Sequence, residues 1–305
     1  MSLRSRIEAF DELSRRFPCE RPSKLISAYR IEEKAPRRLR VAAMLYMSKC
    51  LPGQPVILDE EKLLFELVKH QEEIKNITPN GMIVPKRYTI LEYNILARTF
   101  VEIVNELNVS DFILSWHVPL NLRIKFASVS EENMKRHHPT EHIHSDSWAG
   151  ESSESVTTHL PLFGNTARNR VVFYDPPPEF QEDWLKPRPS YADGATIAQK
   201  YSRIDFIPEK GCLVLADFAT LHASSRFPKA GSRVSIDTTF ALKRIGSHRE
   251  EEKIHPWREN ERAPHQVLMR LGETHLFLFP DDTTQQVDSQ GGFKHPTNLK
   301  LTKLL

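Results

Sequence analysis

His144 and Asp146 place two metal-binding side chains close together in the sequence. In an extended segment side chains alternate between faces, so this imidazole and this carboxylate point to the same side. Both can then bind one metal ion. His222 is the candidate for a third ligand, because it follows a turn-forming segment and a predicted strand at 212–215.

Two histidines and one carboxylate leave the remaining positions of a metal open. This arrangement is typical of non-haem Fe(II) oxygenases, in which those positions accept a chelating molecule and O2. We therefore predict His144, Asp146 and His222 as metal-binding and catalytic residues. His142 offers an alternative His-x-His pair with His144, as in cupin metal sites, but Glu151 lies later than a cupin carboxylate should.

Arg233 and Ser235 indicate a carboxylate-binding site. Together with Asp237 they alternate onto one face of a predicted strand, while Val234 and Ile236 take the opposite face. A guanidinium binds a carboxylate through two parallel hydrogen bonds, and a hydroxyl two residues later adds a third. The distal carboxylate of a dicarboxylic cosubstrate requires such a site.

The elements that must position these residues change character after Asn108. Before it, apolar residues recur at helical spacing and predict helices at 4–16, 60–74 and 89–108, the last with a capping box of Thr89 and Glu92. After it, short apolar runs predict β-strands and indicate a sandwich or a barrel. The runs are 112–116, 120–126, 142–146, 155–160, 171–174, 204–207, 212–215 and 233–242.

We predict three regions along the chain. A helical N-terminal region (1–108) packs on a catalytic core (109–245), and a C-terminal extension (246–305) follows, with no function assigned. A Pro-rich insertion at 176–198 interrupts the core. It is either a lid over the active site or an ordinary surface loop.

These residues resemble the motif of the Fe(II)/2-oxoglutarate-dependent dioxygenases, of the phytanoyl-CoA hydroxylase-like, small-molecule tailoring type. The family's His-x-Asp, distal His and Arg-x-Ser match His144-Ser145-Asp146, His222 and Arg233-Val234-Ser235. The resemblance covers about residues 120–242. It implies a mainly β fold with a helical buttress and a double-stranded β-helix (jelly-roll, cupin-like) core.

The resemblance also implies the chemistry. Fe(II), 2-oxoglutarate and O2 would hydroxylate a substrate, or oxidise it in another way that begins at a C–H bond, with release of succinate and CO2. Asp146 disfavours halogenation, because halogenating relatives lack a carboxylate there. Thr157 lies on a strand that commonly helps to hold 2-oxoglutarate in this family, so it is a candidate cosubstrate ligand or an ordinary strand residue.

Two further residues are candidate substrate contacts. Arg123 alternates along the run 120–126 together with Lys125, and these cations either face the interior, where they would bind a carboxylate or phosphate, or face water. Trp148 follows the metal pair and either lines the substrate pocket or belongs to the core.

Composition narrows the class of partner. The chain has 305 residues, of which 39% are hydrophobic and 27% charged, and a net charge of +2. A small-molecule substrate is therefore expected, with neither nucleic acid nor membrane as partner. Cys19, Cys50 and Cys212 form no CxxC pair, and the first residues lack the apolar core of a signal peptide, so we expect a cytoplasmic protein. The oligomeric state is open.

Two alternatives also remain open. A cupin-like isomerase or binding protein without oxygenase activity would hold the metal and use Arg233 in a structural ion pair. A peptide or protein side chain as substrate would require a long groove beside the metal. The direction of the Arg233 side chain distinguishes the first alternative from an oxygenase.

Overall fold

Strand β10 (Arg233–Leu242) is central to the main sheet and has the bounds that the sequence predicts. The computed structural model describes residues 2–74, 76–118 and 120–242, and the strands at 267–269, 275–278, 286–287, 293–294 and 300–303. The main sheet has the order β1-β2-β8-β5-β10-β3-β11, and β4 also pairs with β10. All of these pairs are antiparallel.

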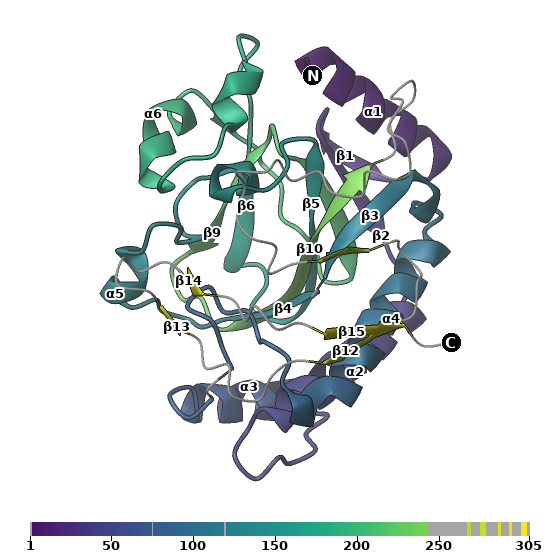
Figure 1. Ribbon diagram of the computed structural model, residues 1–305, viewed down its shortest axis with the longest axis vertical. Helices are drawn as coiled ribbons and strands as arrows, with labels where there is room; N and C mark the ends of the chain where they lie inside the picture. Colours follow the sequence, from purple (N-terminus) through teal and green to yellow (C-terminus); the bar gives the residue numbers. More distant parts are fainter. Residues whose placement is uncertain are drawn as a thin grey trace.

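The strands form two antiparallel sheets around a common interior (Figure 1). The other strands of the main sheet are β1 (Glu20–Ser23), β2 (Ile26–Arg30), β3 (Ile113–Val118), β4 (Asn121–Lys125), β5 (Ser155–Gly164), β8 (Cys212–Asp217) and β11 (Val267–Met269). The second sheet has the order β7 (Ser202–Arg203), β6 (Asn169–Asp175), β9 (Leu221–Arg226). Side chains of both sheets line one cavity, so the predicted double-stranded β-helix is confirmed. Two separate pairs join β12 (His275–Leu278) to β15 (Lys300–Lys303) and β13 (Gln286–Val287) to β14 (Phe293–Lys294).

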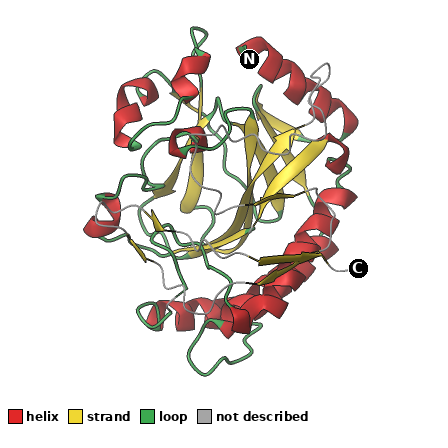
Figure 2. Ribbon diagram, in the orientation of Figure 1, coloured by secondary structure: helices red, strands yellow, loops and turns green. Residues whose placement is uncertain are grey.

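Helices of the N-terminal region (1–108) cover the outer face of the main sheet (Figure 2). The α-helices of the described residues are α1 (Leu3–Arg16), α2 (Lys34–Lys49), α3 (Glu60–Lys69), α4 (Ile90–Glu106), α5 (Glu131–Met134) and α6 (Ala195–Ala198). Val234 and Ile236 of β10 belong to the same buried hydrophobic cluster as Leu39 of α2 and Phe100 of α4. Burial of this cluster on the helices leaves the alternate residues of β10 facing the barrel interior.

Several predicted elements need correction. The helix α2 was not predicted, and α3 ends at Lys69, before the predicted residue 74. The capping box at Thr89 is absent, because the Thr89 hydroxyl instead accepts a hydrogen bond from the backbone N–H of Lys86. The N-terminal region is not purely helical, since β1 and β2 extend the main sheet. Residues 204–207 form no strand, whereas β9 is a strand that the sequence did not predict.

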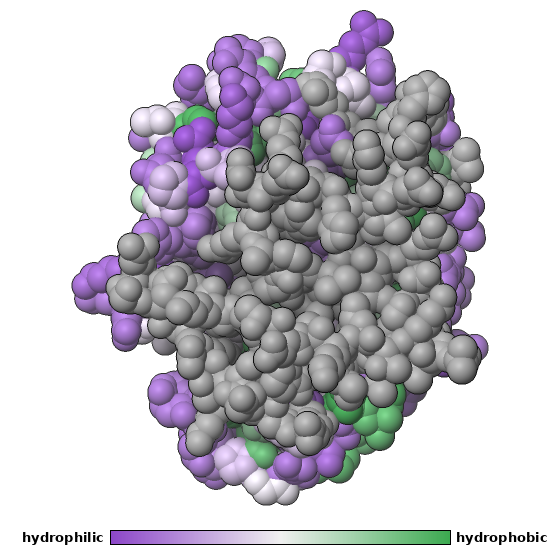
Figure 3. Space-filling view, in the orientation of Figure 1, coloured by the Kyte–Doolittle hydropathy of each residue, from purple (hydrophilic) through white to green (hydrophobic). Residues whose placement is uncertain are grey.

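The insertion at 176–198 folds as short helical turns and is tied to the rest of the molecule. Gly194 packs against the ring of Trp148, where an added Cβ would clash with the ring. Arg6 of α1 donates hydrogen bonds to Glu182 in the insertion. The upper left of Figure 3, where Figure 1 places α6, is mostly hydrophilic on the side turned to the viewer.

No helix within the described residues is long and apolar enough to cross a membrane. Apart from its short strands, the predicted C-terminal extension (246–305) lies outside the residues that the structure describes.

Candidate functional site

The two histidines of the predicted triad are directly paired through their backbones. The His144 N–H donates to the His222 carbonyl at 3.0 Å, and the His222 N–H donates to the His144 carbonyl at 2.8 Å. The predicted strand at 142–146 is reduced to this single bridge, because Asp146 already begins a 3₁₀ turn. Ser145 nevertheless has extended dihedral angles (φ −105°, ψ 144°), so His144 and Asp146 still project to one side.

The three side chains converge on one point. The His144 Nε2 and Asp146 Oδ1 atoms are 3.5 Å apart, and the His222 Nε2 and Asp146 Oδ1 atoms are 3.7 Å apart. One ligand atom from each residue lies within 4.8 Å of the others. A metal ion bound at about 2.0–2.2 Å from each atom fits such a triangle. Among the described residues, no second group of His, Cys, Asp and Glu meets this geometry.

The hydrogen bonds of His144 prepare it to bind a metal. Its Nδ1 lies 2.7 Å from the backbone carbonyl oxygen of His142, which can only accept, so Nδ1 carries the proton. The lone pair is then on Nε2, a buried atom without a hydrogen-bond partner. A carbonyl that fixes the tautomer behind a histidine ligand is the usual outer support of a metal site. The donor set therefore fits a divalent cation.

The charge states of His222 and Asp146 also suit metal binding. Burial lowers the pKa of His222 to about 4, although the neighbouring Asp146 opposes this shift, so the imidazole is neutral near pH 7. Burial disfavours the charged form of Asp146, but His222, His144 and Arg123 together hold its pKa below the ordinary value. A neutral imidazole and an ionised carboxylate are the forms that bind metals.

Arg233 points into the barrel and has no carboxylate partner among the described residues. Only 2% of it is exposed, and its Nη1 and Nη2 donate to His159 Nε2 at 3.2 Å and Ser224 Oγ at 3.3 Å. Burial lowers its pKa to about 10, so it stays charged at neutral pH. Its Nε and the Ser235 hydroxyl are buried without hydrogen-bond partners. An uncompensated buried cation is costly, so this pair of groups fits an incoming carboxylate.

One cavity of about 100 Å³ connects these groups. Asp146, His222, Thr157, Arg233 and Ser235 all line it, so two of the three predicted metal ligands share one space with the predicted carboxylate-binding residues. The rest of its lining is Asn121, Arg123, Lys125, Thr140, Glu151, Thr158, His159, Val171, Phe173, Ser224, Asp237, Thr238 and Thr239.

The two candidate substrate contacts lie in different surroundings. Arg123 faces the cavity, but Asp237 already holds it with Nε–Oδ1 and Nη2–Oδ2 distances of 2.5 and 2.9 Å. Trp148 is fully buried in a hydrophobic cluster, and its Nε1 donates to the Trp184 carbonyl at 2.7 Å. It does not line the cavity, so of the two positions considered for it, substrate pocket or core, it occupies the core.

Sequence reasoning missed two residues beside the metal ligands. The Tyr191 ring stacks on the His144 ring with centroids 4.0 Å apart, and it comes from the insertion, whose position no periodicity could reveal. Glu151 enters the cavity with its Oε2 accepting from the Thr239 hydroxyl at 2.6 Å. Burial, then the negative charge of Asp146, raises its pKa to about 8. Glu151 was considered only as a cupin ligand, and it is not in the metal-binding group.

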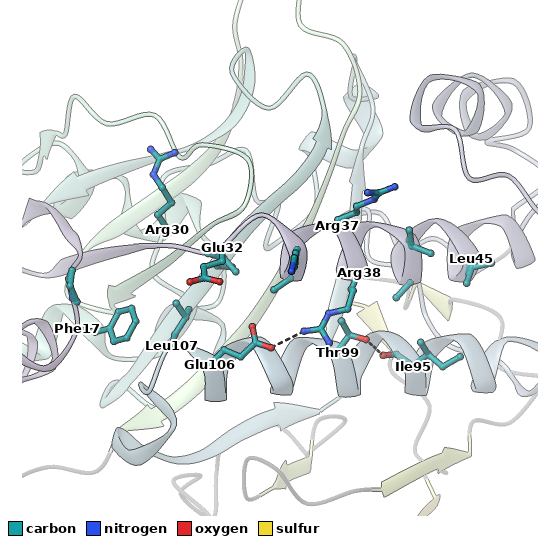
Figure 4. A pocket seen from close by; sticks show the side chains of 16 residues that line it. Phe17, Arg30, Glu32, Arg37, Arg38, Leu45, Ile95, Thr99, Glu106 and Leu107 are labelled. Atoms are coloured by element: carbon teal, nitrogen blue, oxygen red, sulfur yellow. Dashed lines mark hydrogen bonds and ion pairs between the residues drawn. The ribbon is translucent and has the colours of Figure 1, made fainter.

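A larger hollow of about 1270 Å³ lies outside the barrel, beside α2 and α4. Figure 4 shows Arg38 reaching Glu106 there, with Nη2 and Oε1 2.8 Å apart. Both side chains are about half exposed, and neither Arg233 nor a metal-ligand candidate lines the hollow. We therefore place the chemistry in the smaller cavity inside the barrel.

Fold and site together describe a double-stranded β-helix with a two-histidine, one-carboxylate group that shares a cavity with a buried arginine. No protein-family model matches the chain. No curated protein matches it either.

Solved structures of similar fold include non-haem enzymes. The chain is 11% identical to the α-ketoglutarate-dependent epimerase SnoN from nogalamycin biosynthesis, over 77% of this chain and 81% of that one, with a TM-score of 0.38. It is 12% identical to the α-ketoglutarate-dependent carbocyclase SnoK from the same biosynthesis, over 78% of this chain and 96% of that one, with a TM-score of 0.39. It is 15% identical to an N-substituted L-amino acid dioxygenase from Burkholderia ambifaria AMMD, over 76% of this chain and 85% of that one, with a TM-score of 0.39. At such identities and TM-scores, no activity or substrate transfers to this chain.

Proposed function

We propose that this protein is an Fe(II)- and 2-oxoglutarate-dependent oxygenase that oxidises a small molecule. One observation carries the proposal. Asp146 and His222, which form one metal-binding group with His144, line the same cavity as a buried Arg233 that lacks a carboxylate partner among the described residues. A cupin-like protein with Arg233 in a structural ion pair would not leave this guanidinium free to bind a ligand.

The chain's own residues bind and orient. His144, Asp146 and His222 would hold the metal from one side, which leaves its other positions open. Arg233 and Ser235 would bind the distal carboxylate of 2-oxoglutarate, with His159 and Ser224 fixing the guanidinium. When bound there, Fe(II) and 2-oxoglutarate would supply the oxidising power for attack on a C–H bond, with O2 consumed and succinate and CO2 released.

The lining of the cavity supports a compact polar substrate. Most of its side chains are polar or charged. A peptide or protein substrate would require an extended groove next to the metal ligands. Direct hydrogen bonds from the cavity walls would orient a compact polar molecule toward the metal.

The test is an anaerobic titration of the purified protein with Fe(II) and then with 2-oxoglutarate, followed by the weak visible charge-transfer absorption of the chelate. We expect the absorption in the parent, its loss in His222→Ala, and a much higher 2-oxoglutarate requirement in Arg233→Ala. His142→Ala is the matched control, because it removes a nearby histidine side chain and keeps the carbonyl that supports His144. A parent that binds iron but gives no absorption with 2-oxoglutarate would contradict the proposal.

A further inference from the structure

Lys125 is a second buried cation in the same cavity as Arg233. The two residues are direct cross-strand partners on β4 and β10, which puts their Cβ atoms about 4.5–5.5 Å apart on one face of the sheet. Lys125 is 3% exposed and Arg233 is 2% exposed, and both line the cavity. Two adjacent buried cations repel each other, so an arrangement of this kind needs negative charge nearby.

The two cationic groups are held at the same end of the cavity. Lys125 Nζ donates to the Thr140 hydroxyl at 2.5 Å. The Thr140 carbonyl accepts from the Ser224 N–H at 2.7 Å, and the Ser224 hydroxyl accepts from Arg233 Nη2 at 3.3 Å. The hydrogen bond between Thr140 and Ser224 thus connects the Lys125 ammonium group to the Arg233 guanidinium.

Positive charge exceeds negative charge around this pair. Glu141 Oε1 accepts from Lys125 Nζ and from Arg226 Nη1, each at 3.1 Å, so one carboxylate serves two cations. Arg233 adds a third cation without a carboxylate of its own among the described residues. Asp237 cannot supply the missing charge, because Arg123 binds both of its oxygens. The excess favours an anionic ligand at this end of the cavity.

We propose that Lys125 acts with Arg233 as a second cationic contact for the distal carboxylate of 2-oxoglutarate. The inference rests on the proposed function and makes it more specific. The cosubstrate pocket then selects a dicarboxylate over a 2-oxo monocarboxylate through two side chains on adjacent strands. Burial, which outweighs the effect of Glu141, lowers the pKa of Lys125 to about 7, so the unliganded lysine lacks full charge compensation.

The test compares 2-oxoglutarate with pyruvate, which has the same chelating end and lacks the distal carboxylate. Dissociation constants are measured anaerobically at pH 7 on the Fe(II)-loaded protein, by calorimetry and chelate absorption. We expect Lys125→Met to weaken 2-oxoglutarate binding about tenfold or more, the effect of one lost charge-assisted contact, and to leave pyruvate binding unchanged. Lys125→Arg should restore part of the loss, since it keeps the charge.

Two controls keep the result interpretable. Lys86→Met removes another buried lysine, 5% exposed, that does not line the cavity, and it should leave both dissociation constants unchanged. Fe(II) affinity of Lys125→Met should equal that of the parent. Equal weakening of 2-oxoglutarate and pyruvate, or no weakening of either, would overturn the inference while the parent's chelate upholds the proposed function. A parent that forms no chelate would overturn both.

Discussion

Lys125 shows how burial sets the protonation of one residue in the cavity. Three charged groups act on it: Arg123 on its own strand, Glu141 in the segment before the metal ligands, and Arg233 on β10. Arg226 on β9 shares the Glu141 carboxylate. Loss of hydration is the largest effect and lowers its pKa to about 7. The lysine is therefore half protonated near neutral pH in the unliganded protein.

This protonation predicts a pH dependence of cosubstrate binding. An anion beside Lys125 favours the charged ammonium, so above pH 7 binding must take up a proton. We expect the 2-oxoglutarate dissociation constant to rise with pH between 7 and 9, by up to about tenfold per unit. Titrations at saturating Fe(II) across this range measure the effect.

Lys125→Met is the control for that dependence. The pKa of Glu151, raised by burial to about 8, falls in the same range, and its ionisation also disfavours a dianion. The difference between the pH profiles of the parent and of Lys125→Met therefore gives the contribution of Lys125 alone. Parallel pH profiles in the two proteins would show that Lys125 does not titrate on binding.

The residue types in the site were predictable, but their partners were not. His144, Asp146, His222, Arg233 and Ser235 could be selected because only certain side chains bind metals or carboxylates. The ion pair between Arg123 and Asp237 could not be predicted, because it depends on the pairing of β4 with β10. Alternation shows which residues share a face, and pairing decides which of them touch.

At the scale of elements, local signals predicted those with strong periodicity. Strand β10 and helix α1 have regular patterns, and both are found. The helix α2 escaped detection because its N-cap, Glu33, makes no side-chain capping bond and several of its buried residues are small alanines. The polar strand β9 is held by its pairing with β6, which no local pattern reports.

One buried ion-pair group connects α1 to distant elements. Arg6 is fully buried and donates to Asp217 at the end of β8 at 2.7 Å and to both oxygens of Glu182 in the insertion. We expect Arg6→Met to lower the free energy of unfolding by about 3–5 kcal/mol, because it leaves the buried Asp217 carboxylate without its cation. Urea denaturation followed by circular dichroism measures this change.

Arg4 on the same helix provides the comparison. Its side chain is 88% exposed and pairs with Glu8, which is 61% exposed. Arg4→Met should change the free energy of unfolding by no more than about 0.5 kcal/mol, because water screens such pairs. A similar small change in Arg6→Met would mean that the buried group contributes little to stability.

At the scale of the whole molecule, the site couples ligand binding to folding. The metal ligands come from the segment before β5 and from β9, and Arg233 comes from β10, so the complete site exists only in the folded chain. A ligand present at a hundredfold excess over its dissociation constant stabilises the fold by about 2.7 kcal/mol. Binding should therefore be visible in thermal unfolding.

We expect Fe(II) at such an excess to raise the melting temperature by on the order of 5 °C under anaerobic conditions, and a chelator to reverse the rise. Addition of 2-oxoglutarate should raise it further. In His222→Ala the iron-dependent rise should disappear. An unchanged melting temperature in the parent would indicate that the three side chains do not form a metal site.

The sequence alone determined the chemical capacity of this protein: which side chains can bind a metal or a carboxylate, and which of them share a strand face. These properties depend on side-chain chemistry and on the two-residue period of a strand, both of which are local. The tertiary structure decided which face is interior, that His144 pairs with His222, that Tyr191 stacks on His144, and that Trp148 lies in the core. Such contacts join residues far apart in the chain, and only the packing of the whole fold brings them together.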